Sequence, residues 1–212
     1  MDYSSYVSLV MRDKQLKRKN MKSSKIAIVV NGVKMVLPAE VIKMRNDGVT
    51  PYVYGSPVVA GKIIKMYVKS KYPNILVWTK SSSFANGNSL DVYVCEPNGD
   101  EVNASTYSDI NTLVNAFEYG KFNGWTDCYD SYETSGLKTE NGTEIEAGVK
   151  YAHCNNKAPF GSYPDVVRML EGMIKGEYVF GPLSLEKAIE KVKGYKVTDA
   201  TISKALPYLK VA

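Results

Sequence analysis

Few side chains in this chain of 212 residues could form or break a covalent bond. There is a single histidine, His153, so a serine or cysteine nucleophile that needs an imidazole base would have to use it. Its neighbour Cys154 points to the opposite side in any extended segment. The other cysteines, Cys95 and Cys128, add no zinc-ligand spacing, and no glycine-rich phosphate cradle occurs. We therefore expect no catalytic residue, no metal and no cofactor.

An acidic and aromatic stretch from Phe122 to Glu133 could do other chemistry. Its carboxylates recur at every third position, so on a helix they would share one face and could hold a divalent cation in a metal-dependent enzyme. Gly124 and the density of aromatic residues favour instead an irregular or strand-like segment with a structural or protein-contact role. The side chains expected to contact a partner here are Trp125, Asp127, Tyr129, Asp130, Tyr132 and Glu133.

The charges of the chain are strongly segregated. Residues 1–80 hold 15 Lys and Arg against 4 Asp and Glu, residues 81–149 hold 2 against 12, and residues 150–212 hold 10 against 6. Two interpretations remain open: the blocks neutralise one another within one fold, or the acidic block presents phosphate-like charge to a basic groove on another protein. Nucleic acid would be attracted to the two ends and repelled by the middle.

Residues 1–24 form a basic arm that is either solvated or in contact with phosphates. Its candidate nucleic-acid contacts are Arg12, Lys14, Lys17, Arg18 and Lys19, and Met21 offers an internal start. The beginning of the chain lacks the apolar core of a secretory signal, and the aliphatic run Ile26–Val30 is too short to span a bilayer. We expect no membrane association, three unpaired thiols and a location in the cytoplasm of a bacterial host.

Secondary structure is predicted from periodicity and turn residues. Asn31-Gly32 between two β-branched runs predicts a hairpin over residues 25–37. A short helix is expected over 38–46, and Ser56-Pro57 predicts a helix that runs to about Lys71. Strands are expected over 74–82 and 89–95, joined by a connection of five residues that presents Phe84 and Asn86 as partner contacts, and a helix is expected over 109–119.

The segment from 61 to 133 carries a pattern of residues typical of a known family: Lys71, Tyr72, Pro73, Ser82, Ser83, Phe84, Gly87, Ser89, Leu90, Asp91, Val92, Phe117, Gly120, Phe122, Gly124, Asp127, Tyr129 and Tyr132. With these residues the segment resembles the large polyvalent protein-associated domain of the twenty-ninth type, found in proteins that phages and conjugative elements carry into new hosts. The family usually has a second glycine at Asn88 and an F-D-G-M sequence where this chain has residues 122–125. The resemblance implies a biological origin in a phage or mobile element and specifies no chemistry.

The rest of the chain is expected to be one more hairpin and a helical unit. Asn141-Gly142 predicts a hairpin over 140–154, and the polar segment 155–161 is the expected domain boundary. Helices are predicted over 163–175, 185–193 and 198–208. The last two resemble a bacterial helix-turn-helix in which Ile202 and Leu206 dock on the preceding helix and Thr201, Ser203 and Lys204 reach DNA.

We expect an α+β fold, with a small antiparallel sheet that has helices packed on one face and a small C-terminal helical unit after it. The expected domain organisation is a basic arm over 1–24, an α+β domain over 25–155 and a helical unit over 156–212. The leading functional hypothesis is a non-catalytic accessory protein that binds a host protein or ribonucleoprotein complex, plausibly a nucleic-acid-handling defence complex. A DNA-binding regulator, with DNA or RNA held at the basic ends, and a metal-dependent enzyme are the alternatives.

Overall fold

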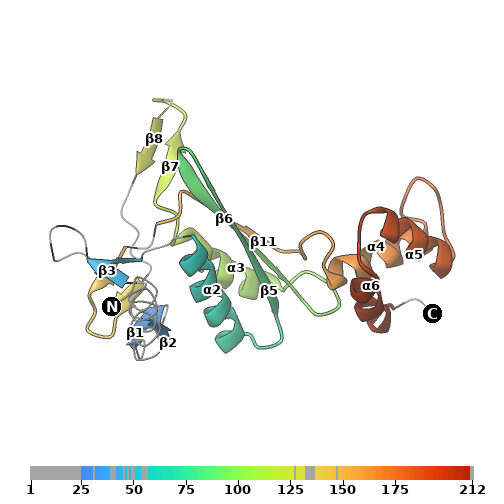
Figure 1. The fold of residues 1–212 in the computed structure, drawn as a ribbon, viewed down its shortest axis with the longest axis horizontal. Coiled ribbons are helices and arrows are strands. Elements are labelled where there is room, and N and C mark those ends of the chain that lie inside the picture. The colour runs from blue at the N-terminus through green and yellow to red at the C-terminus, as the bar shows by residue number, and fades with distance from the viewer. Residues whose placement is uncertain are drawn as a thin grey trace, which may run out of the picture.

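The structure is a computed structural model that describes residues 25–30, 32–38, 42–44, 46, 48, 51–53, 57–126, 128–131, 137–146 and 148–210. Within these residues the chain forms five helices and four small sheets, which confirms the predicted α+β class. Figure 1 shows two helices at the centre of the larger unit, a β-hairpin that projects from it, and a helical unit at the C-terminal end. The predicted basic arm, with Arg12, Lys14, Lys17, Arg18, Lys19 and Met21, lies outside the described residues.

The first hairpin is confirmed. β1 (Lys25–Val30) pairs antiparallel with β2 (Val33–Pro38), and Val30 lies opposite Val33, so the turn has two residues. Gly32 has a φ of 79°, as such a tight turn requires, while Asn31 is outside the described residues. β9 (Leu137–Thr139) pairs with the other edge of β1, and β10 (Glu144–Ile145) pairs with β9.

The helix expected over 38–46 is wrong. Pro38 ends β2, and β3 (Ile42–Met44) pairs antiparallel with β4 (Pro51–Val53). A helix of this length is marginal without tertiary contacts, and the β-branched pair before Lys43 favours an extended backbone.

A second sheet has the order β11-β6-β5. β5 (Leu76–Phe84) and β6 (Gly87–Cys95) are antiparallel and joined by a turn of two residues, so the longer connection expected over 84–88 is wrong. β11 (Tyr151–Asn155) pairs in parallel with β6 rather than with residues 140–145, so this part of the predicted hairpin is wrong as well. The turn at 141–142 instead joins β9 to β10.

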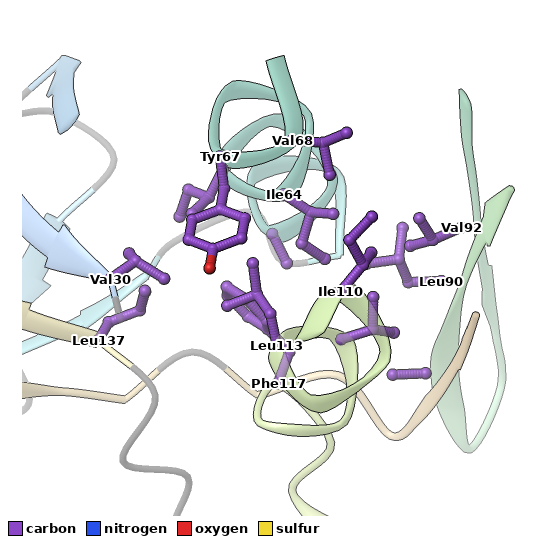
Figure 2. Packing of buried hydrophobic residues seen from close by; sticks show 14 of the residues in the cluster. Val30, Ile64, Tyr67, Val68, Leu90, Val92, Ile110, Leu113, Phe117 and Leu137 are labelled. Atoms are coloured by element: carbon purple, nitrogen blue, oxygen red, sulfur yellow. The ribbon is translucent and has the colours of Figure 1, made fainter. Parts of the chain in front are cut away.

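The core of the larger unit is a layer of two helices between the sheet β10-β9-β1-β2 and the sheet β11-β6-β5. α2 (Val58–Lys71) contacts β5 and β6 on one side and β2 on the other, and α3 (Ala104–Asn115) packs beside it. In Figure 2 the helices meet Val30 and Leu137 from one sheet and Leu90 and Val92 from the other. The apolar residues that recur at helical spacing in the two predicted helices are buried in this layer: Val59, Ile63, Ile64, Tyr67, Ile110, Leu113, Val114 and Phe117.

α3 begins five residues before its predicted start because Asn103 caps it, with a side chain that accepts a hydrogen bond from the Thr106 amide at 3.0 Å. After α3 the chain makes a long excursion that includes β9 and β10 and returns to its starting point. Val149 donates to the Phe117 carbonyl at 2.7 Å and accepts from the Tyr119 amide at 3.0 Å. The excursion contains the projecting hairpin of β7 (Gly120–Asn123) and β8 (Cys128–Ser131).

The C-terminal helices are confirmed at nearly the predicted residues. α4 (Tyr163–Lys175) is followed by α5 (Leu185–Gly194), α6 (Asp199–Ala205) and a 3₁₀ turn, η2 (Leu206–Tyr208). α4 packs against both α5 and α6, and their apolar side chains form a cluster separate from the first core. The segment 156–162 joins the two units. No helix in the described part of the chain is long and apolar enough to span a membrane.

Candidate functional site

The β7–β8 hairpin places one predicted contact residue, Trp125, at its tip. Trp125 is 99% exposed, and its amide donates a hydrogen bond of 3.0 Å to the side-chain carbonyl of Asn123. The side-chain amide nitrogen of Asn123 in turn donates a hydrogen bond of 2.8 Å to the Asp130 carboxylate. Asn123 therefore ties the backbone of the turn at Trp125 to the Asp130 side chain of β8.

The rest of the predicted acidic stretch does not assemble into a metal site in the described structure. Asp127, Tyr132 and Glu133 lie outside the described residues, and Tyr129 is placed only as part of the β8 backbone. Because Cys128–Ser131 is a strand, the helical spacing that a shared carboxylate face requires is absent there. No group of three or more His, Cys, Asp or Glu side chains that could hold a metal occurs among the described residues.

The β5–β6 turn forms a second tip with the other two predicted contact residues. Phe84 is 49% exposed and stacks on Tyr151, with ring centroids 6.1 Å apart. The Asn86 carbonyl accepts a hydrogen bond of 2.8 Å from the Lys150 ammonium, and the Lys150 amide donates to the Asn88 side chain at 2.8 Å. The parallel strand β11 thus braces this tip through residues that the sequence did not single out.

The thiols and the histidine do not form a catalytic pair. His153 is exposed and Cys154 packs against the core, on the opposite face of β11, as expected for neighbours in a strand. Burial raises the pKa of Cys154 to about 11, and burial together with nearby Glu96 raises the pKa of Cys95 to about 12. Both thiols are therefore protonated at neutral pH, whereas thiolate is the nucleophilic form.

In the helical unit, the cap and one docking residue of the predicted helix-turn-helix are present. Thr198 caps α6 by accepting a hydrogen bond from the Thr201 amide at 3.2 Å, and Ile202 is buried in the cluster with Ala188 and Val192. Leu206 is 37% exposed, because it begins the 3₁₀ turn, so its expected docking on α5 is wrong.

The three residues predicted to reach DNA do not share one free surface. Thr201 and Lys204 line a groove of about 780 Å³ whose opposite wall is formed by the end of α2 and the start of β5. The Lys204 ammonium lies over the Tyr163 ring, 4.5 Å from its centroid, whereas Ser203 is exposed and does not line the groove. Sequence reasoning missed Lys69, Trp78 and Tyr163, which line the same groove but come from distant segments.

Two residues of the family resemblance have a structural role. Lys71 and Tyr72 both donate hydrogen bonds to the Asp109 carboxylate, at 3.1 and 2.9 Å, and the buried Tyr67 phenol donates to it at 2.9 Å. The hydrogen bonds with Tyr67 and Asp109 raise the pKa of Lys71. This cluster joins α2 to α3 and keeps the ammonium charged.

Some acidic side chains of residues 81–149 form ion pairs with basic side chains of the other two blocks. Ion pairs join Lys34 to Glu140, Lys71 to Asp109, and Lys210 to Asp100. The hydrogen bond from Lys210, 3.1 Å from the Asp100 oxygen, is the main cause that lowers the pKa of Asp100. These contacts support internal neutralisation for three acids of the middle block, while Asp130 takes its hydrogen bond from a neutral amide.

No protein-family model, curated protein or solved structure matches this chain. The resemblance of residues 61–133 to a polyvalent protein-associated domain therefore stays a prediction.

Proposed function

We propose that this chain is a non-catalytic accessory protein of a phage or mobile element that binds a component of its bacterial host. The observation that carries the proposal is Trp125, which is 99% exposed at the tip of the projecting β7–β8 hairpin. Tryptophan is among the residues most enriched in the energetic centres of protein interfaces, because a partner's pocket can desolvate its large ring.

The surroundings of Trp125 define what the partner must offer. Asn123 holds the tip through two hydrogen bonds, so less conformational freedom is lost when the ring is buried. Asp130 is exposed on β8 of the same hairpin, within a block of the sequence that holds 12 Asp and Glu against 2 Lys and Arg. A host protein with an apolar pocket at the edge of a basic groove fits these features, and a nucleic-acid-handling defence complex has grooves of this charge.

The two alternative functions have less support. The metal-dependent enzyme requires a helix where Cys128–Ser131 is a strand. The duplex-binding regulator requires a helix surface that can enter the major groove, whereas Thr201 and Lys204 of α6 face the groove opposite β5.

The proposal is tested by photo-crosslinking from the hairpin tip. A photoreactive phenylalanine analogue is placed at Trp125 in the full chain or, as a control, at Phe160, an aromatic residue 72% exposed in the segment that joins the two units. In lysates of bacterial hosts we expect a discrete protein adduct from position 125 and not from 160. Asp130→Lys should weaken this adduct, and so should added salt. Identical adducts from both positions, or none from 125, would refute the proposal.

A further inference from the structure

The groove between the two units has the composition of an anion site with flat, apolar platforms. Lys69 at the end of α2 and Lys204 on α6 line it from the two units, and Trp78 and Tyr163 add an aromatic ring from each. None of the described residues that line the groove is acidic. Its volume of about 780 Å³ is within the range of ligand-binding clefts, roughly 300 to 1,000 Å³.

We propose that this groove binds single-stranded nucleic acid, with phosphates held by Lys69 and Lys204 and a base stacked on Trp78. Proteins that hold single strands combine a cationic groove along the backbone with aromatic rings on which bases stack. This site is separate from the β7–β8 hairpin and does not depend on the proposed host-protein contact.

Tyr163 and Lys204, which line the groove from the helical unit, are held by contacts within that unit. Tyr208 packs against Tyr163 with ring centroids 5.3 Å apart, and the Lys204 ammonium lies 4.5 Å from the Tyr163 centroid. Tyr163 therefore holds the Lys204 cation at the groove, and the ring that remains for base stacking is Trp78. The Thr201 hydroxyl, 2.9 Å from that of Thr198, adds a polar group to the same wall.

The cationic character continues beyond the groove. Lys62, Lys65 and Lys69 recur at helical spacing, so they share one face of α2. This face borders the start of β5, because Lys69 lines the groove together with the first residues of that strand. On the sheet face opposite the helices, Trp78 lies across from Tyr93, and Lys80 lies across from Asp91. An extended strand that leaves the groove along this sheet face would meet Tyr93 and Lys80, with Asp91 as the opposing charge, whereas Lys62 and Lys65 lie on the helix side of the sheet.

The geometry favours a single strand over two other ligands. A duplex needs an element that protrudes into its grooves, whereas Thr201 and Lys204 face the wall formed by α2 and β5. An acidic peptide would use the lysines and could pair with the edge of β5, but it would leave the Trp78 ring without the stacking partner that a base supplies.

Tryptophan fluorescence reports on the groove directly. The chain has two tryptophans, so the full-length Trp125→Phe protein keeps Trp78 as its single tryptophan. This protein is titrated at low salt with 12-nucleotide single-stranded DNA, the matching RNA, the DNA duplex and an oligo-glutamate peptide. We expect saturable quenching by a single strand, with DNA and RNA compared to define the preferred sugar, and weaker binding of the duplex and the peptide.

Two charge-reversed variants decide whether the groove is responsible. Lys69→Glu with Lys204→Glu should lower affinity at least about tenfold, because two phosphate contacts are lost. The control, Lys25→Glu with Lys187→Glu, makes the same charge change at exposed positions outside the groove and should retain most of the affinity. Trp78→Ala, followed by fluorescence anisotropy, should weaken binding roughly tenfold, as expected for loss of one stacked base. Equal effects of the two charge variants, preference for the duplex or the peptide, or no quenching would overturn the proposal.

Discussion

Tyr67 and Asp109 join the two central helices: the Tyr67 phenol, fully buried on α2, donates a 2.9 Å hydrogen bond to the Asp109 carboxylate on α3. Lys71 and Tyr72 donate to the same carboxylate from the end of α2. Burial disfavours the charged carboxylate, but the hydrogen bonds from Tyr67, Lys71 and Tyr72 together outweigh it, so the pKa of Asp109 lies below its ordinary value.

Replacing Asp109 should therefore give a loss of stability that depends on pH. A carboxyl group whose pKa is lowered in the folded state stabilises the protein above its unfolded pKa, about 4, and loses this effect as pH falls through its folded pKa. We expect Asp109→Asn to lower the free energy of unfolding by about 1 to 2 kcal/mol at pH 7. Urea unfolding of both proteins from pH 7 to pH 3 should show the difference shrinking. A difference that grows toward low pH would contradict this assignment.

Phe117→Ala tests the packing of the helical layer. Phe117 is 1% exposed, so its truncation leaves a cavity between α3 and the sheets and should cost about 3 to 5 kcal/mol. The matched control is Phe160→Ala, which removes a ring that is 72% exposed and should change stability by less than about 0.5 kcal/mol. Thermal unfolding followed by circular dichroism measures both, and equal midpoints for the two variants would show that Phe117 does not pack as described.

Gly99→Ala tests the junction between the units. Gly99 has a φ of 89°, and a Cβ there would lie 2.7 Å from the Pro164 carbonyl oxygen in the first turn of α4. The matched control is Gly142→Ala, which has a φ of 82° and no atom within 4 Å of the added carbon. Both variants carry backbone strain of about 1 to 2 kcal/mol. We expect Gly99→Ala alone to displace α4 and to speed tryptic cleavage after Lys157, and equal cleavage of the two variants would argue against this contact.

The three thiols should differ in reactivity. The raised pKa values of Cys95, about 12, and Cys154, about 11, keep both thiols protonated at pH 8, whereas Cys128 is exposed. A chromogenic disulfide reagent should modify one thiol per folded chain rapidly and all three in denaturant. Cys128→Ser should remove the fast phase, and a fast phase that survives this change would mean that a buried thiol is accessible.

Local signals predicted most helices and the first hairpin. Ser184 and Thr198 cap α5 and α6 through their side chains, and Gly176 ends α4 with a φ of 77°, as their residue types indicate. Each of these signals acts within a few residues, so the sequence carries it directly. The predicted ends of α4 and α5 lie within one residue of the observed ones, whereas the helix expected over 198–208 ends at Ala205 and is followed by a 3₁₀ turn to Tyr208.

Pairing between distant strands was not predictable in this way. β11 joins β6 in parallel, with Tyr151 opposite Ser89, and no local pattern distinguishes this partner from the nearer β10. The candidate groove depends on the same kind of information, because Lys69, Trp78 and Lys204 meet only after both units have folded and docked. The exposed tip at Trp125 was within reach of sequence reasoning because its aromatic and acidic residues are neighbours in the chain.

The antiparallel pairing of Gly120 with Ser131 brings the two ends of the projecting hairpin together at its base. The length of the projecting hairpin therefore has little effect on the stability of the rest of the fold. Each doubling of a loop whose ends already meet raises the free-energy cost of closing it by only about 0.6 kcal/mol. A fluorescent reporter inserted between Gly124 and Trp125 should leave the helical layer intact, which makes the hairpin an exchangeable cassette on a constant frame.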